Sequence, residues 1–180
     1  MMRFGLSILL LAAAILAGCN YRMASSLDGG PTRTIFLTTV ENQLYPPRAG
    51  LEYDLTRRFK DEIAVDRRLR LVDGAADINM RATLIGFDEP TIVKTLDSGL
   101  PAEILVRATV VVEAWGDGIA GQPKRIGDVE VENVITRRIT VSDTYAPAAG
   151  DSRETALERL WRDLAREMID FVTDYEWARG

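Results

Sequence analysis

Few side chains in this sequence could carry chemistry. The 180 residues include one Cys, Cys19, and no His. The lack of His excludes Ser-His-Asp and Cys-His catalysis and imidazole metal sites. A single Cys excludes an intramolecular disulfide and the multi-cysteine zinc and iron–sulfur sites. Only carboxylate-based catalysis remains open, so the composition favours a binding or structural protein that is not an enzyme and holds no cofactor or metal.

Basic side chains occur in short groups that could recognise an anion, because guanidinium groups bind phosphate and carboxylate through forked donors. The groups are Arg57-Arg58, Arg67-Arg68 with Arg70, Lys124-Arg125 and Arg137-Arg138. The alternative is that each group only keeps the surface soluble. The whole chain has 22 basic and 27 acidic residues and a net charge of −5, which argues against binding to nucleic acid.

Arg137 differs from the other basic residues because it lies on the mainly apolar face of an alternating segment. The apolar residues of that segment are Val129, Val131, Ile135, Ile139 and Val141. A charged side chain on this face has two explanations. Either Arg137 pairs with a buried acid, or this end of the strand projects past the core as a binding tip.

The N-terminal segment is typical of an export signal. A charged start is followed by an apolar run of 14 residues, Phe4 to Ala17, which is shorter than the about 20 residues that span a membrane. Leu16-Ala17-Gly18-Cys19 resembles a bacterial lipobox, which implies cleavage after residue 18 and acylation of Cys19, with palmitate among the acyl groups. We therefore expect a lipoprotein signal peptide at 1–18, and a lipidated Cys19 with a small, polar tether over 19–32.

Two amphipathic helices are predicted in the remaining chain. Leu51, Leu55, Phe59 and Ile63 follow at intervals of four, which indicates a helix with one apolar face. Residues 151–175 form the clearest helical pattern, and Asp151 and Glu154 stand in a capping-box-like relation at its start. The apolar positions of that second helix are Leu157, Leu160, Trp161, Leu164, Met168, Phe171, Val172 and Tyr175.

Strand patterns fill the space between and around the helices. Segments 34–40, 69–72, 78–84, 104–114 and 129–141 are rich in strand-forming residues, and the third resumes at Ile92 and Val93. Most of them alternate between apolar and polar residues, as antiparallel strands covered on one side do. Residues 116–127 are predicted to be a turn. We expect one domain over residues 33–178, an α+β two-layer sandwich of a mainly antiparallel sheet with both helices on one face.

Several short motifs resemble those of the lipopolysaccharide-assembly lipoprotein family LptE. An aromatic residue follows the Cys closely in Cys19-Asn20-Tyr21, and the first strand ends in an Asn-bearing loop. That loop is Val40-Glu41-Asn42. The remaining motifs, in chain order, are Gly50-Leu51-Glu52 with Leu55-Thr56, Ala76-Asp77 and Ile85-Gly86-Phe87. Their order, together with the lipobox, extends the resemblance over nearly all of the chain after the signal peptide.

The resemblance implies an outer-membrane lipoprotein, anchored by its N-terminal lipid at the periplasmic face. Asn20 agrees with this location, since it is not the Asp associated with inner-membrane retention. Family members plug the lumen of the large outer-membrane β-barrel LptD and assist lipopolysaccharide transport to the outer leaflet. On this basis we expect LptD and lipopolysaccharide as partners. We name four basic residues as candidates for binding lipopolysaccharide phosphates: Arg137, Arg138, Lys124 and Arg125.

Two other functions stay open on the sequence alone. The first is a periplasmic lipoprotein that serves as auxiliary subunit of a lipid transporter or as activator of a cell-wall synthase. The second is a periplasmic hydrolase with paired carboxylates.

Overall fold

The computed structural model describes residues 33–97, 99–116 and 121–175. The predicted signal peptide, Cys19 and the tether lie outside these residues. Within them no helix is both long enough and apolar enough to cross a membrane. The elements in chain order are β1 (Arg33–Leu37), β2 (Glu41–Asn42), α2 (Leu51–Val65), β3 (Leu69–Leu71), β4 (Ile78–Asp88), β5 (Thr91–Lys94), β6 (Pro101–Gly116), β7 (Gln122–Ile126), β8 (Val129–Tyr145), the 3₁₀ turn η1 (Pro147–Ala149) and α3 (Arg153–Thr173).

The strands form one sheet in the order β3-β1-β4-β6-β8-β7, with β2 beside β4 and β5 beside β6. The long strands β4, β6 and β8 pair antiparallel, whereas β1 runs parallel to both β3 and β4. The parallel pairing follows from α2, because a helix between β1 and β3 provides the crossover that parallel neighbours require. The predicted α+β sandwich is confirmed, and its sheet is mixed.

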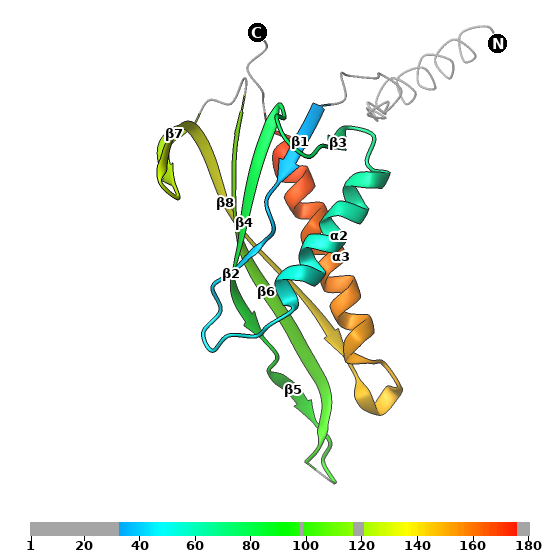
Figure 1. The fold of residues 1–180 in the computed structure, drawn as a ribbon. Coiled ribbons are helices and arrows are strands. Elements are labelled where there is room, and N and C mark those ends of the chain that lie inside the picture. The colour runs from blue at the N-terminus through cyan, green and yellow to red at the C-terminus, as the bar shows by residue number, and fades with distance from the viewer. Residues whose placement is uncertain (1–32, 98, 117–120, 176–180) are drawn as a thin grey trace, which may run out of the picture. The chain divides into compact units, whose positions relative to one another are not determined.

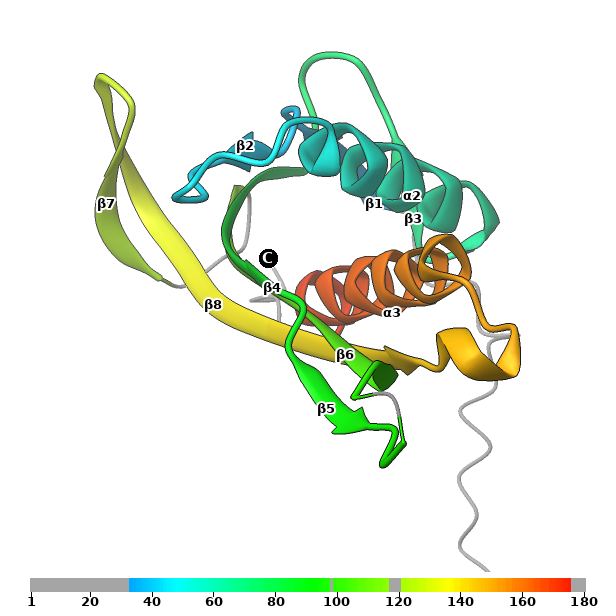
Figure 2. The same cartoon turned by 90° about the horizontal axis from the view of Figure 1, so that it is seen from below.

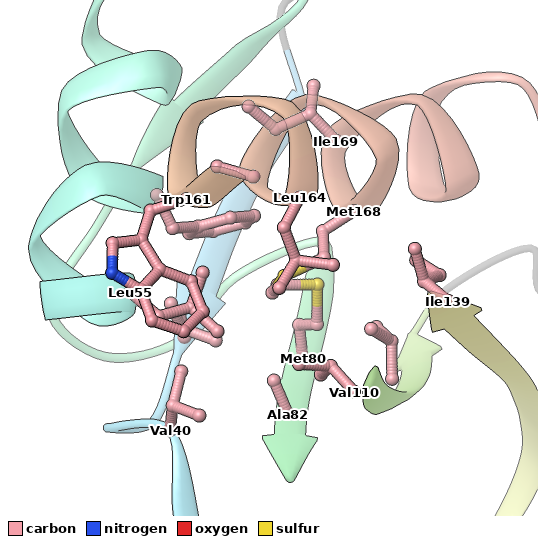
Figure 3. Packing of buried hydrophobic residues seen from close by; sticks show 14 of the residues in the cluster. Val40, Leu55, Met80, Ala82, Val110, Ile139, Trp161, Leu164, Met168 and Ile169 are labelled. Atoms are coloured by element: carbon pink, nitrogen blue, oxygen red, sulfur yellow. The ribbon is translucent and has the colours of Figure 1, made fainter. Parts of the chain in front are cut away.

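Both helices lie side by side on one face of the sheet (Figures 1 and 2). The predicted apolar positions of α2 are buried: Leu51, Leu55, Phe59 and Ile63. The α3 helix buries Leu160, Trp161, Leu164 and Met168. In Figure 3, Leu164 and Met168 point toward Met80 of β4, and Trp161 lies beside Leu55 of α2. The opposite face carries the polar residues of the same strands and has no helix over it within the described residues; we call it the open face.

Three local predictions from the sequence are wrong. Residues 122–126 are not part of a turn but form β7, which pairs with β8. All but the last residue of β7 are exposed, and Pro123 fits only an edge strand, so no hydrophobic alternation marks it. The segment 34–40 is not one strand, because β1 ends at Leu37. The predicted capping-box-like pair Asp151 and Glu154 does not cap α3. Its N-cap is Ser152, whose hydroxyl accepts from the Thr155 amide.

Candidate functional site

Arg137 and Arg138 are adjacent on β8 and leave the strand on opposite faces of the sheet. Arg137 lies opposite the buried Val112, on the face that carries the helices, and Arg138 lies opposite Val111 on the open face. Both are exposed. The Arg137 guanidinium sits over the Phe171 ring, 5.9 Å from its centroid, a cation–π contact. Within the described residues Arg137 has no acidic partner, so of the two explanations the pairing with a buried acid is wrong.

The two arginines line a groove of about 740 Å³ between β8 and α3. We call it the edge groove. One wall is the continuous run of β8 from Arg137 to Ser142. The other wall is one polar face of α3, with side chains at the spacing i, i+3, i+4, i+7: Asp163, Arg166, Glu167 and Asp170.

Two of the charged side chains on the α3 wall already have partners from α2 or the segment after it. Arg166 Nε donates to Glu62 at 3.0 Å, and Asp170 accepts from Arg68 at 2.8 Å. Hydrogen bonds from Arg68 to Asp66, and then to Asp170, raise the pKa of the Arg68 guanidinium although burial opposes this. These ion pairs fix the two helices to each other and do not form a ligand site.

Four other side chains of the edge groove carry charge that no ion pair within the described residues balances: Arg137, Arg138, Asp163 and Glu167. The helix α3 runs back along β8, since Arg159 near its start holds Asp143 and Phe171 near its end lies under Arg137. By this alignment Asp163 lies toward Ser142, and Glu167, one helical turn before Phe171, lies closer to Arg137 and Arg138.

Lys124 and Arg125 do not join this site. Both are on β7, in the hairpin that β7 forms with the start of β8. The Lys124 ammonium forms an ion pair with Glu113, a carboxylate that is largely buried. Arg125 has no ion pair within the described residues. The structure thus divides the four predicted residues between two places, Arg137 and Arg138 in the edge groove and Lys124 and Arg125 on the hairpin.

A line of charges crosses the open face and was not predicted. Arg81 Nη2 donates to Glu41 at 2.7 Å, and this bond raises the Arg81 pKa despite burial. Arg81 lies opposite Glu113 in the register of β4 and β6, and Glu113 in turn binds Lys124. The sequence places Arg81 and Glu113 at polar positions of their strands, but Glu41 and Lys124 were expected in a loop and a turn, and the order of the strands in the sheet brings the four together.

The hairpin of β5 and β6 exposes large apolar side chains: Ile92, Val93, Leu96 and Leu100. It extends away from the rest of the sheet (Figure 1). Ile92 and Val93 were predicted to continue a half-buried strand. They are instead about half exposed, because β5 pairs only with β6 and lies beyond the reach of the helices.

In each of the other two basic groups, one arginine forms ion pairs: Arg57 and Arg68. Arg57 pairs with Asp54 at 3.2 Å on α2, and Arg57 and Arg58 line a second groove, about 480 Å³, between α2 and α3. Across the described ranges, no three acidic or thiol side chains gather as they would around a metal ion.

Similar solved structures come from several bacteria. The hypothetical protein CT253 from Chlamydia trachomatis is 11% identical, covers 79% of this chain and 96% of its own, and superposes with a TM-score of 0.52. Rare lipoprotein B from Shewanella oneidensis is 16% identical, with 78% and 94% covered and a TM-score of 0.46. A minor lipoprotein from Acinetobacter baumannii is 13% identical, with 83% and 98% covered and a TM-score of 0.46. At these identities the likeness concerns the fold alone.

No curated protein sequence matches the chain. A family model does match it, over residues 32–172, and its description is LptE, lipopolysaccharide-assembly. The match extends from the start of β1 to the end of α3 and so includes every described element. The chain therefore belongs to the lipopolysaccharide-assembly family LptE.

Proposed function

We propose that this chain is an outer-membrane lipoprotein that acts as plug and assembly partner of an LptD-type β-barrel in lipopolysaccharide transport to the outer leaflet. The observation that carries the proposal is the family match over the whole described domain. Acylation of Cys19 holds the domain at the periplasmic face of the membrane. Tethering raises the effective concentration of the domain near a barrel in the same membrane.

The surface of the domain is compatible with a water-filled barrel lumen. The open face is polar, and its charges are paired in a line from Glu41 to Lys124. The interior of a large barrel is polar too, so this face can lie against it with the charges of that line already paired.

Arg137 and Arg138 are the basic residues best placed to bind a lipopolysaccharide phosphate. They are neighbours, they are exposed, and no acid within the described residues neutralises them. A phosphate accepts charge-assisted hydrogen bonds from the forked donors of a guanidinium group. Lys124 is a weaker candidate for phosphate binding than the two arginines, because its ammonium is already paired with Glu113.

Crosslinking in intact cells, followed by identification of the partner, tests the proposal. Recovery of a large outer-membrane barrel with the chain supports it. Recovery of an inner-membrane transporter or of a cell-wall synthase instead would replace it with the corresponding alternative.

Charge reversal tests the phosphate contact. Arg137→Glu with Arg138→Glu should weaken binding of purified lipopolysaccharide several-fold more than the matched pair Arg57→Glu with Arg58→Glu. Both double variants change the charge by the same amount, and Arg57 already has an acidic neighbour. Equal losses from the two pairs would reduce the effect to net charge alone.

A further inference from the structure

One edge of β8 has no strand beside it within the described residues. On one side β8 pairs with β6 along its whole length from Ile135 to Tyr145. The strand β7 pairs only with the earlier part of β8, up to Val134, where the β6 pairing ends, and no strand within the described residues pairs with the other side of β8 after Val134. The stretch after Val134 is therefore a free edge, and the edge groove runs along it.

The hydrogen bonds at the end of β8 show which backbone groups face this free edge. Leu105 of β6 lies opposite Thr144, and its amide donates away from β8, to the Pro90 carbonyl at 3.0 Å. The Thr144 carbonyl also points away from β6, because it accepts from Arg159 Nη2 at 3.0 Å. Leu105 and Thr144 are thus a pair without mutual backbone bonds, and such pairs recur at every second residue of an antiparallel ladder.

The β6–β8 register has no shift, so the alternation extends back along the strand. Arg138, Thr140 and Ser142 therefore direct their amides and carbonyls into the edge groove, whereas Ile139 and Val141 bond to β6. The 3.0 Å contact between the Thr109 and Thr140 hydroxyls agrees with this assignment, since side chains lie closer in pairs that lack backbone bonds.

Side chains close the edge at Thr144 and nowhere before it. The Thr144 carbonyl is held by Arg159, and its amide donates to its neighbour Asp143 at 2.7 Å. No side chain or strand among the described residues bonds to the outward backbone of Arg138, Thr140 or Ser142. These three residues follow one another along the strand at intervals of about 6.7 Å. They present a row of backbone donors and acceptors to which an added strand can bond.

We propose that the β8 edge from Arg138 to Ser142 binds an extended segment of a partner polypeptide as an added strand. The charges of the edge groove define that segment. An acidic side chain of the segment lies beside Arg137 and Arg138 of β8, and basic side chains lie beside Asp163 and Glu167 on the α3 wall. The inference rests on the proposed role of the chain as partner of another protein, and it specifies how that contact is made.

A photoreactive side chain at Ser142 of the full chain, expressed in its own cells, tests the inference. It should crosslink to one segment of a partner polypeptide, and mass spectrometry of the crosslinked peptide should find both acidic and basic side chains in it. Thr140→Pro removes an amide donor that faces the edge groove and leaves the β6 ladder intact. It should lower the crosslinking yield at least about fivefold, as the loss of about one ordinary hydrogen bond would, while Thr140→Ala should leave the yield within about twofold.

Thermal unfolding shows whether Thr140→Pro has folded. If it has not, Asp163→Lys with Glu167→Lys decides, because both residues are on the exposed face of α3 and their reversal should lower the same yield at least about threefold. Crosslinks only to lipopolysaccharide, only to a second copy of the chain, or to nothing would overturn the inference. So would a folded Thr140→Pro protein that crosslinks as the unchanged chain does.

The outcomes also separate this inference from the proposed function. A barrel that copurifies with the chain, together with no effect of Thr140→Pro, keeps the proposed function and rejects strand addition. A proline-sensitive crosslink to a polypeptide that is not a barrel supports strand addition and rejects the proposed function.

Discussion

Glu89 joins three parts of the domain, and its replacement by Gln is the sharpest test of how they are held together. Its carboxylate accepts from Arg48 Nη1 at 2.9 Å and from Arg153 at 2.6 and 3.1 Å. Arg48 belongs to the loop before α2, Glu89 follows β4, and Arg153 is the first residue of α3. Glu89→Gln keeps the shape of the side chain and removes the charge that both guanidinium groups share.

The expected loss follows from burial. The Glu89 side chain is 17% exposed, whereas both arginines are 43% exposed. Breaking a buried ion pair costs about 3–5 kcal/mol because a charge is left unpaired, and an exposed pair contributes about 0–1 kcal/mol. Here the arginines can regain water, so we expect Glu89→Gln to lower the free energy of unfolding by about 1–2 kcal/mol at pH 7.

The loss should depend on pH with a definite sign. Burial alone raises the pKa of Glu89, but the hydrogen bonds and charges of Arg153 and Arg48 outweigh it and the net pKa is lowered. A lowered carboxyl pKa in the folded state contributes stability that is complete above the pKa of the unfolded chain, about 4.3. That contribution disappears as the pH falls through the folded pKa. The difference between the unchanged chain and Glu89→Gln should therefore be constant above about pH 5.5 and shrink below it.

Urea unfolding at pH 7, 5.5 and 3.5, followed by the fluorescence of the buried Trp161, measures this difference. Glu130→Gln is the control, since Glu130 is exposed and has no ion pair within the described residues. Equal stability of Glu89→Gln and the unchanged chain at pH 7 would refute the reasoning. A difference that grows as the pH falls would refute it too.

Three further outcomes are expected. Leu164→Ala should lower the free energy of unfolding by about 2–5 kcal/mol, because Leu164 is fully buried. The control Val65→Ala, at an exposed position, should change it by less than about 0.5 kcal/mol. Similar urea midpoints for the two variants would contradict the described core. Gly116→Ala should lower it by about 1–3 kcal/mol, since a Cβ there would collide with the Asp77 carbonyl oxygen; unchanged thermal unfolding would count against that close approach. Cys19→Ser should abolish the incorporation of radiolabelled palmitate, and labelling that persists in this variant would reject the anchor.

The sequence predicts those elements whose periodicity comes from a single buried face. The helix over Leu51–Val65 and the alternation from Ile78 to Leu84 are of this kind, and both match the structure. The strand Gln122–Ile126 could not be predicted, because its pairing with β8 stabilises it and no buried face does. The exposure of Ile92 and Val93 could not be predicted either, since it depends on how far the helices reach.

The candidate site was predictable in part. The position of Arg137 on an apolar face identified it as unusual, and the structure places it at the border of the core over Phe171. The edge groove needed one further fact, that α3 returns along β8 and brings Asp163 and Glu167 beside that strand. Residues more than twenty positions apart meet there, and no local spacing encodes such a contact.

The place of β1 in the sheet has a mechanical consequence. Everything N-terminal to Arg33 enters the domain through β1, which lies between β3 and β4 and is parallel to both. A pull on that end loads the hydrogen bonds on both sides of β1 together, in shear, instead of opening them one at a time from a sheet edge. In a domain held to a membrane through this strand, a force along the tether would therefore have to break the bonds to β3 and β4 together before β1 could leave the sheet.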